Sequence, residues 1–301
     1  MYDLIIIGAG PAGITAGVYA ARKRMSSLVI TRDIGGQAVW SAEISNYPGY
    51  QLISGPDLVA KFEEHLRTYA VALKENERVV GLRKTGSTII VKTEKGEYDS
   101  RTCVVASGKR SQALGVPGER EFKNRGVTYC ATCDGPLFAD KDAAVIGGGN
   151  SALDAALQLM KICRHTYIIN TARTLTGDPV MREKVEHNPA VSVLNNTRVT
   201  AVLGDTMVNA LQIEKDGKQE RLSIQGVFVE IGLMPNSDFA PDLEKNALGE
   251  IRVNCRSETN IPGIFASGDV TDVPEKQIIV AAGEGAKASL GAFRYLAQNK
   301  F

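Results

Sequence analysis

The sequence predicts an α/β protein made of two similar three-layer domains. A repeat carries this prediction, because residues 3–17 and 143–156 each contain a short apolar run, a glycine-rich turn and an alanine-rich segment. A continuous apolar run is typical of a parallel strand buried on both faces, and the segment after the turn suits a helix. Length agrees, since 301 residues exceed what one hydrophobic core usually organises.

Segment 57–71 predicts an amphipathic helix. Ser54 and Asp57 supply capping chemistry, and Pro56 takes a permitted early position. Apolar residues recur in this segment at helical spacing, namely Leu58, Phe62, Leu66 and Tyr69.

Alternation of apolar and polar residues predicts a small β-meander in each domain. The first covers residues 78–105, and a similar strand-rich tract covers 199–232. Small and apolar residues at helical spacing over 277–297 predict a last helix that packs against the first domain.

Two turns rich in proline and glycine, Gly115–Gly118 and Gly232–Pro235, bracket the second repeat. We interpret them as a double hinge, with rigid connectors as the alternative. The first domain is then discontinuous, with residues 1–114 and 240–301, and residues 115–239 form an inserted second domain. Insertion is tolerated because the ends of a domain often lie close together.

Charge and composition exclude several classes of partner. The 35 basic and 34 acidic residues are interspersed and give a net charge of +1, which favours neither nucleic acid nor an anionic membrane as partner. The amino terminus runs straight into a strand pattern without a leader, and no apolar run approaches the roughly 20 residues that span a bilayer. We therefore expect a soluble, cytoplasmic protein.

The first glycine turn matches a dinucleotide-binding pattern in its required context. Gly8 permits a tight turn, Gly10 lets the backbone approach a pyrophosphate, and Gly13 allows close helix packing, with Pro11 and Ala12 between them. The helix that follows adds the positive end of its dipole. A turn that merely closes a strand–helix unit is the alternative, so the pattern alone is weak.

A second turn of this kind consists of Gly147, Gly148, Gly149, Asn150, Ser151 and Ala152, with alanine at the third position of the pattern. Both domains are therefore predicted to be Rossmann-like and to bind nucleotides. Two sites in one chain suggest a flavin nucleotide that exchanges hydride with a nicotinamide nucleotide.

The decisive motif is the cysteine pair Cys130 and Cys133, followed by Asp134. Two intervening residues let the sulfur atoms form a small, easily reduced disulfide ring, and a helical turn at the second cysteine would favour its thiolate. Asp134 is placed to move protons during exchange. Zinc would need further ligands that the three scattered histidines do not supply, so no metal is expected. An inert structural disulfide stays open.

At these motifs the chain resembles the low-molecular-weight thioredoxin reductase family over essentially its whole length. Segments 126–138 and 283–290 are even closer to the flavoprotein component of bacterial alkyl hydroperoxide reductase. That component carries an extra amino-terminal thioredoxin-like part, so here we expect any such shuttle to be a separate protein. The resemblance implies FAD, thioredoxin or a thioredoxin-like dithiol protein as partner, and a homodimer.

The resemblance also implies further FAD contacts. They are Gly35, Gly36, Gln37, Asn46, Ala106, Ser107, Gly108, Gly268, Asp269, Lys276, Gln277 and Ile278. Asp269 follows an apolar strand and could accept a hydrogen bond from a ribityl hydroxyl, although capping is an equal alternative. Gln277 opens the final helix, whose positive end would stabilise a reduced flavin; ordinary helix initiation is the alternative.

By the same resemblance, Cys133 faces the flavin and Cys130 attacks the disulfide of the partner. The inserted domain then has to rotate between two orientations, as a double hinge permits.

The chain departs from the family after the second strand of the inserted domain. NADPH-dependent thioredoxin reductases carry there a His-Arg-Arg motif and a later arginine, where this chain has Asn170, Thr171, Ala172 and Thr176. A 2′-phosphate would lack its usual arginine contacts, and Asn170 can still bond ribose hydroxyls. NADH is therefore favoured over NADPH, and ferredoxin or a deazaflavin is a third possible donor.

Rival functions are a reductase of a peroxiredoxin-system shuttle, a ferredoxin-NADP reductase and a flavin-binding redox sensor without turnover. Ferredoxin-NADP reductases lack the paired cysteines, and a sensor makes poor use of a thiol pair beside two nucleotide sites.

Overall fold

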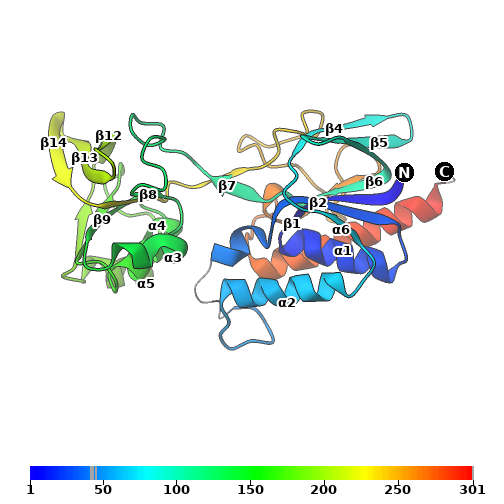
Figure 1. Ribbon diagram of the computed structural model, residues 1–301, viewed down its shortest axis with the longest axis horizontal. Helices are drawn as coiled ribbons and strands as arrows, with labels where there is room; N and C mark the ends of the chain where they lie inside the picture. The colour runs from blue at the N-terminus through cyan, green and yellow to red at the C-terminus, as the bar shows by residue number, and fades with distance from the viewer. Residues whose placement is uncertain (41–43, 45, 300–301) are drawn as a thin grey trace. The chain divides into compact units, whose positions relative to one another are not determined.

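The computed structural model describes residues 1–40, 44 and 46–299, with only the backbone of Trp40 and Cys133. The chain forms two compact units, Met1–Arg110 with Met234–Phe301, and Ser111–Leu233. Short strands β7 (Lys109–Ser111) and β16 (Leu233–Pro235) pair where the chain passes from one unit to the other (Figure 1).

The turn Gly115–Gly118, which the sequence suggested as the first hinge, does not coincide with the crossing between the units. The crossing lies between Arg110 and Ser111, and the turn is held inside the second unit. The Val202 amide donates to the carbonyl of Pro117 over 2.9 Å, and a Cβ on Gly118 would lie 2.1 Å from the Val202 carbonyl oxygen. The other crossing falls between Leu233 and Met234, within the second predicted hinge segment.

The first unit is a three-layer α/β structure. Its sheet has the order β3-β2-β1-β6-β5-β4, and β17 also pairs with β6. The parallel strands are β1 (Tyr2–Ala9), β2 (Ser27–Ile34), β3 (Ala72–Lys74), β6 (Glu97–Val105) and β17 (Ile264–Ala266). The predicted β-meander is confirmed, because β4 (Val79–Thr85), β5 (Thr88–Thr93) and β6 pair antiparallel.

Alternate residues of β1 supply two different hydrophobic cores. Leu4 and Ile6 pack on the side of helices α1 (Pro11–Arg22), α2 (Gly55–Arg67) and α6 (Ile278–Gln298). Ile5 and Ile7 pack on the other side, under the β-meander. Figure 1 shows the helices on one face of β1 and β2 and the β4–β5 hairpin on the other. A strand buried on both faces requires the continuous apolar run seen in the sequence.

The second unit repeats this design. Its parallel sheet has the order β11-β10-β9-β15-β8. These strands are β11 (Val191–Leu194), β10 (His165–Ile169), β9 (Asp142–Ile146), β15 (Gly226–Val229) and β8 (Val127–Thr128). The same unit contains the helices α3 (Ala131–Asp134), α4 (Asn150–Leu159) and α5 (Pro179–Glu186). The second β-meander is β12 (Thr197–Gly204), β13 (Val208–Lys215) and β14 (Lys218–Ser223).

The helices predicted over residues 57–71 and 277–297 are confirmed, with shifted ends. Ser54 caps α2, and its Oγ accepts from the Asp57 amide over 3.2 Å, but this helix ends at Arg67 rather than at residue 71. The final helix spans Ile278–Gln298. In the strand-rich tract 199–232, β15 leaves the meander and joins the parallel sheet. Within the described part of the chain, no helix combines the length and apolar character that a membrane crossing requires.

Candidate functional site

The turn between β1 and α1 forms a cradle of bare backbone. Gly8 has a φ of +105°, and a Cβ there would lie 2.4 Å from the carbonyl oxygen of Ala106. A Cβ on Gly13 would lie 1.9 Å from the carbonyl oxygen of Gly8, so only glycine allows α1 to begin this close to the strand. Gly10 is the N-cap, and a Cβ there would lie no closer than 3.9 Å to its nearest described neighbour, the Gly35 carbonyl oxygen.

The structure brings two further segments with predicted FAD contacts next to this turn. A Cβ on Gly36 would lie 3.5 Å from Cα of Gly10, and a Cβ on Gly268 would lie 3.0 Å from Cβ of Ala12. These contacts place the loop after β2 and the short helix Gly268–Val270 beside the start of α1, where Pro11 is the first helical residue.

Two side-chain hydrogen bonds join further members of the predicted set. Gln37 Nε2 donates to the carbonyl of Lys109 over 2.9 Å, directly after Gly108. Asn46 Nδ2 donates to Oε1 of Gln277 over 3.0 Å, and Gln277 is the N-cap of α6, which begins at Ile278. Sequence separations of 72 and 231 residues make both pairings products of the tertiary fold.

Ser107 is used structurally. Its Oγ donates to the carbonyl of Asn236 over 2.6 Å, and Nδ2 of Asn236 donates back to the carbonyl of Ser107 over 2.9 Å. This reciprocal pair holds the two chain segments of the first unit together directly beside the crossing.

A buried ion cluster lies close to Asp269, and sequence reasoning missed its centre, Glu250. Oε1 of Glu250 lies 2.9 Å from Nζ of Lys109 and 3.0 Å from Nζ of Lys276. Burial would raise the pKa of this carboxyl, but hydrogen bonds from Lys109, Asn246 and Lys276 lower it to about 2. Burial raises the pKa of Asp269, and the two lysines offset part of that effect.

These residues fit an anionic dinucleotide such as FAD. The first turn of α1 contains no acidic residue, and its N-cap glycine makes no side-chain capping bond, so the first amides of the helix stay available for a phosphate. Open space beside Gly10 lets the pyrophosphate approach the backbone. Gly8, Gly10, Pro11, Ala12 and Gly13 would hold it there.

The second glycine turn has the same construction. Gly147 has a φ of +140°, and a Cβ there would lie 2.2 Å from the carbonyl oxygen of Glu230 and 3.1 Å from Cβ of Ala152. Gly149 is the N-cap of α4, makes no side-chain capping bond and has open space around its Cα. Ser151 is exposed in the first turn. This helix end therefore also suits a pyrophosphate.

Asn150 and Asn170 both order the loop that follows β10. Asn150 Oδ1 accepts from the Asp178 amide over 2.7 Å. Asn170 is 5% exposed, and its Nδ2 donates to the carbonyl of Thr174 over 2.8 Å and to Oδ1 of Asn195 over 3.0 Å. Its Oδ1 accepts from the Ala172 amide over 3.2 Å. Ribose hydroxyls would have to compete with these bonds, which the sequence-based assignment of Asn170 did not anticipate.

A carboxyl pair lies beside the second turn and was also missed. Glu230 directly follows β15 and Asp154 lies on α4. Burial and, to a smaller extent, the charge of Asp154 raise the pKa of Glu230 to about 8. The sequence signal that could have identified Glu230 is an acidic residue directly after a buried apolar strand. Strands β9 and β15 are neighbours at the switch point of the sheet, where α/β proteins bind ligands.

The redox turn, residues 130–134, contains one turn of helix, α3, and follows strand β8 after Tyr129. Cys130 is half-buried and disulfide-bonded, whereas the side chain of Cys133 lies outside the described residues. Asp134 Oδ2 accepts a hydrogen bond from the Thr128 hydroxyl, and Oγ1 of Thr128 accepts from the Cys130 amide over 3.2 Å. Thr128, which sequence reasoning missed, thereby connects Asp134 to the backbone of Cys130.

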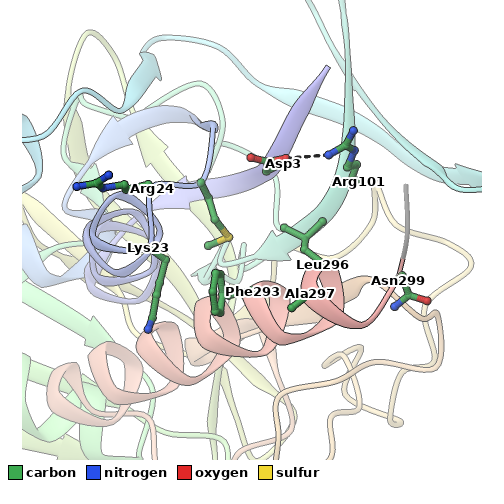
Figure 2. A pocket seen from close by; sticks show the side chains of 9 residues that line it. Asp3, Lys23, Arg24, Arg101, Phe293, Leu296, Ala297 and Asn299 are labelled. Carbon is green, nitrogen blue, oxygen red and sulfur yellow. Dashed lines mark hydrogen bonds and ion pairs between the residues drawn. The ribbon is translucent and has the colours of Figure 1, made fainter.

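A cavity of about 410 Å³ lies at the other end of the first sheet (Figure 2). Asp3, at the start of β1, forms an ion pair with Arg101 over 3.3 Å, and Lys23 Nζ lies 5.0 Å from the centre of the Phe293 ring. Ligands of parallel α/β sheets bind at the carboxyl ends of the strands. This cavity lies at the amino ends, away from Gly8, and is not part of the candidate site.

Each of the two α/β units has a glycine turn at the start of a helix, without a side-chain cap. The second unit also carries a disulfide on a helical turn. Together these features define the fold and site of a nucleotide-dependent disulfide oxidoreductase. The pyridine nucleotide-disulphide oxidoreductase family matches residues 2–285, and the chain belongs to this family.

Relatives place the chain more narrowly. The thioredoxin reductase of Lactococcus lactis is 34% identical with a TM-score of 0.92, and the match covers 99% of this chain and 100% of that one. An NADH dehydrogenase of Bacillus subtilis is 39% identical over 99% of this chain and 59% of its own length. A component of the alkyl hydroperoxide reductase of Pseudomonas aeruginosa is 41% identical over 98% and 58%. The chain thus spans less than two thirds of the length of the Bacillus and Pseudomonas relatives.

Proposed function

We propose that the chain is a flavin-dependent disulfide reductase that passes electrons from NADH, by way of FAD, to thioredoxin or a thioredoxin-like protein. The observation that carries this proposal is the disulfide at Cys130, on a helical turn in the same unit as the second glycine turn. FAD supplies a carrier that accepts a hydride from a nicotinamide and delivers two electrons to a disulfide.

The residues of the first unit bind and orient that carrier. The start of α1 would hold the pyrophosphate, and the start of α6 at Gln277 and Ile278 would direct partial positive charge towards the flavin. We keep Gly35, Gly36, Asn46 and Asp269 as further contacts, because the fold brings their segments to the same helix starts.

The redox turn carries the exchange chemistry. In the dithiol form, the Cys130 thiolate attacks the disulfide of the partner and forms a mixed disulfide, and the partner's second sulfur leaves with an electron pair and takes a proton. Cys133 then attacks Cys130, which restores the internal disulfide and releases the partner as a dithiol. Asp134, held by Thr128, is proposed to supply and recover the proton.

Cysteine variants test the assignment. Cys130→Ser and Cys133→Ser should keep bound FAD and reduction of the flavin by the donor, and lose turnover of the partner disulfide. Cys255→Ser is the matched control, because Cys255 is an exposed free thiol. Turnover retained in either of the first two variants would contradict the function. An Asp134→Asn variant should flatten the pH profile of exchange without loss of FAD.

NADH is favoured because the loop after β10 presents exposed Thr171, Ala172 and Thr176 where a 2′-phosphate would need arginine. The B. subtilis relative is named an NADH dehydrogenase, which agrees. Anaerobic titration with NADH should bleach the flavin at lower concentrations than NADPH. Thr171→Arg with Ala172→Arg should improve kcat/KM for NADPH about tenfold or more. Failure with both nucleotides would move the donor to ferredoxin or a deazaflavin.

A second candidate for the partner protein is a separate shuttle of a peroxiredoxin system. Relatives named as components of alkyl hydroperoxide reductase favour it, and this chain spans 58–60% of their length. Turnover rates with thioredoxin and with an isolated thioredoxin-like shuttle domain separate the two. We also propose a homodimer, which light scattering on the purified protein checks; a monomer mass contradicts that part alone.

A further inference from the structure

A buried carboxylate connects the redox turn to the segment where the chain enters the second unit. Glu119 is 2% exposed. Its Oε1 accepts from the Leu114 amide over 2.7 Å and from the Tyr129 hydroxyl over 2.7 Å, and its Oε2 accepts from the Gly115 amide over 2.6 Å. Leu114 and Gly115 follow the crossing at Ser111 closely, and Tyr129 directly precedes Cys130.

These bonds hold the Tyr129 side chain strongly. Hydrogen bonds to an ionised acceptor in a buried place are stronger than neutral bonds in water. Burial and, next, the bond to Glu119 raise the pKa of the Tyr129 hydroxyl, which therefore remains a donor. Lys123 Nζ lies 5.5 Å from the centre of the same ring. Tyr129 is thus restrained at its hydroxyl and at its ring face.

We propose that Glu119 is a positioning residue for the redox turn, which by holding Tyr129 restrains the backbone before Cys130 and favours the disulfide over the dithiol. A disulfide requires narrow geometry, so a restraint on one cysteine reduces the entropy lost when the ring closes. The Cys130 amide is held a second time by Thr128 Oγ1 over 3.2 Å. This inference deepens the proposed function and rests on it for its role in turnover.

Tyr129→Phe is the gentlest test. It removes one donor and leaves Glu119 with the Leu114 and Gly115 amides, so the carboxylate is not left unpaired. Tyr98→Phe is a matched control in the first unit. Tyr98 donates to buried Glu77 over 2.9 Å, and Glu77 keeps the Thr93 hydroxyl as a donor over 2.6 Å. Both variants should lower the thermal midpoint by similar amounts.

The full chain is equilibrated with buffers of reduced and oxidised dithiothreitol, and its free thiols are then trapped with an alkylating agent. Mass spectrometry quantifies the reduced and oxidised forms of the peptide that contains Cys130. Tyr129→Phe should lower the equilibrium constant for disulfide formation about threefold or more, which corresponds to about 14 mV. Glu119→Gln keeps an acceptor oxygen but removes its charge, so it should shift the constant in the same direction by weakening the bond to Tyr129. The double variant should add little, because both changes act on the same bond.

The inference is overturned if the equilibrium constant for disulfide formation in Tyr129→Phe stays within about 1.5-fold of the value for the unaltered protein. An equal shift of this constant in Tyr98→Phe also overturns it. Failure of the proposed function looks different. In that case the unaltered protein turns over no partner disulfide, while the shift in Tyr129→Phe remains measurable in the dithiothreitol buffers.

Discussion

The Thr132 hydroxyl, between the two cysteines of the redox turn, donates a hydrogen bond to Oε1 of Gln158 on α4 over 2.8 Å. Nε2 of Gln158 in turn donates to Oδ2 of Asp154 over 2.8 Å. The redox turn is therefore tied by side chains to the helix that begins at the second glycine turn.

Thr132→Val should lower the free energy of unfolding by about 1 kcal/mol and slow thiol–disulfide exchange, because the isosteric side chain cannot donate to Gln158. Thr132→Ser keeps a hydroxyl and should therefore retain most of the free energy of unfolding and most of the exchange rate. Urea denaturation and stopped-flow exchange with a model disulfide provide the measurements. A larger loss in Thr132→Ser than in Thr132→Val would show that the packing of the methyl group matters rather than the hydrogen bond.

The carboxyl of Glu230 predicts a loss of stability towards alkaline pH. Its folded pKa of about 8 lies above the ordinary value of 4.5, so its contribution is fully present below about pH 4.5 and is lost as pH rises through 8. Glu230→Gln should gain roughly 2 kcal/mol relative to the unaltered protein at pH 9 and little at pH 4. Glu220→Gln, on the exposed surface of β14, is the control.

The carboxyl of Glu250 predicts the opposite pH dependence of stability. Its folded pKa of about 2 lies below 4.5, so its stabilisation is present above about pH 4.5 and disappears as pH falls towards 2. The loss should be on the order of 3 kcal/mol. In Glu250→Gln, the free energy of unfolding should be lower near neutral pH, since Lys109 and Lys276 lose their carboxylate partner. Its decrease towards acid pH should be shallower. Urea denaturation between pH 2 and 6 tests the slope; unchanged slopes would refute the assignment.

Two glycines of α6 should respond oppositely to alanine. A Cβ on Gly285 would lie 2.0 Å from the carbonyl oxygen of Ala12, whereas a Cβ on Gly283 meets nothing within 4 Å among the residues described. Gly285→Ala should therefore lower stability by about 1–3 kcal/mol or more and weaken FAD binding, because α1 and α6 must separate. Gly283→Ala should raise stability by up to about 1 kcal/mol. Thermal unfolding and flavin retention on gel filtration report both.

Strand–turn–helix units could be predicted because their signals are local. The apolar runs of β1 and β9 and the glycines after them directly encode buried strands and tight turns. Helix ends were less predictable. The apolar spacing continues to Tyr69, but α2 ends at Arg67, and Tyr69 packs against the core from the turn beyond the helix.

The candidate site divides in the same way. Glycines 8, 10, 13, 147 and 149 could be found from spacing, whereas Glu119 and Glu250 belong to no recognised motif. Glu119 bonds groups only four to ten residues away, and Glu250 pairs with Lys109, which lies 141 residues away. Asn170 shows the limit clearly. Its position in the chain suggested a ribose ligand, and only the fold shows that its side chain is buried and hydrogen-bonded within the loop after β10.

The sequence by itself determined the two α/β units, their glycine turns and the cysteine pair, because each depends on residues that are neighbours along the chain. Only the tertiary structure decided what surrounds the redox turn. Thr128, Tyr129 and Thr132 are anchored by Asp134, Glu119 and Gln158, and the last bond spans 26 residues. Buried carboxylates and amides must find partners somewhere in the fold, and only the packing of strands and helices selects which ones.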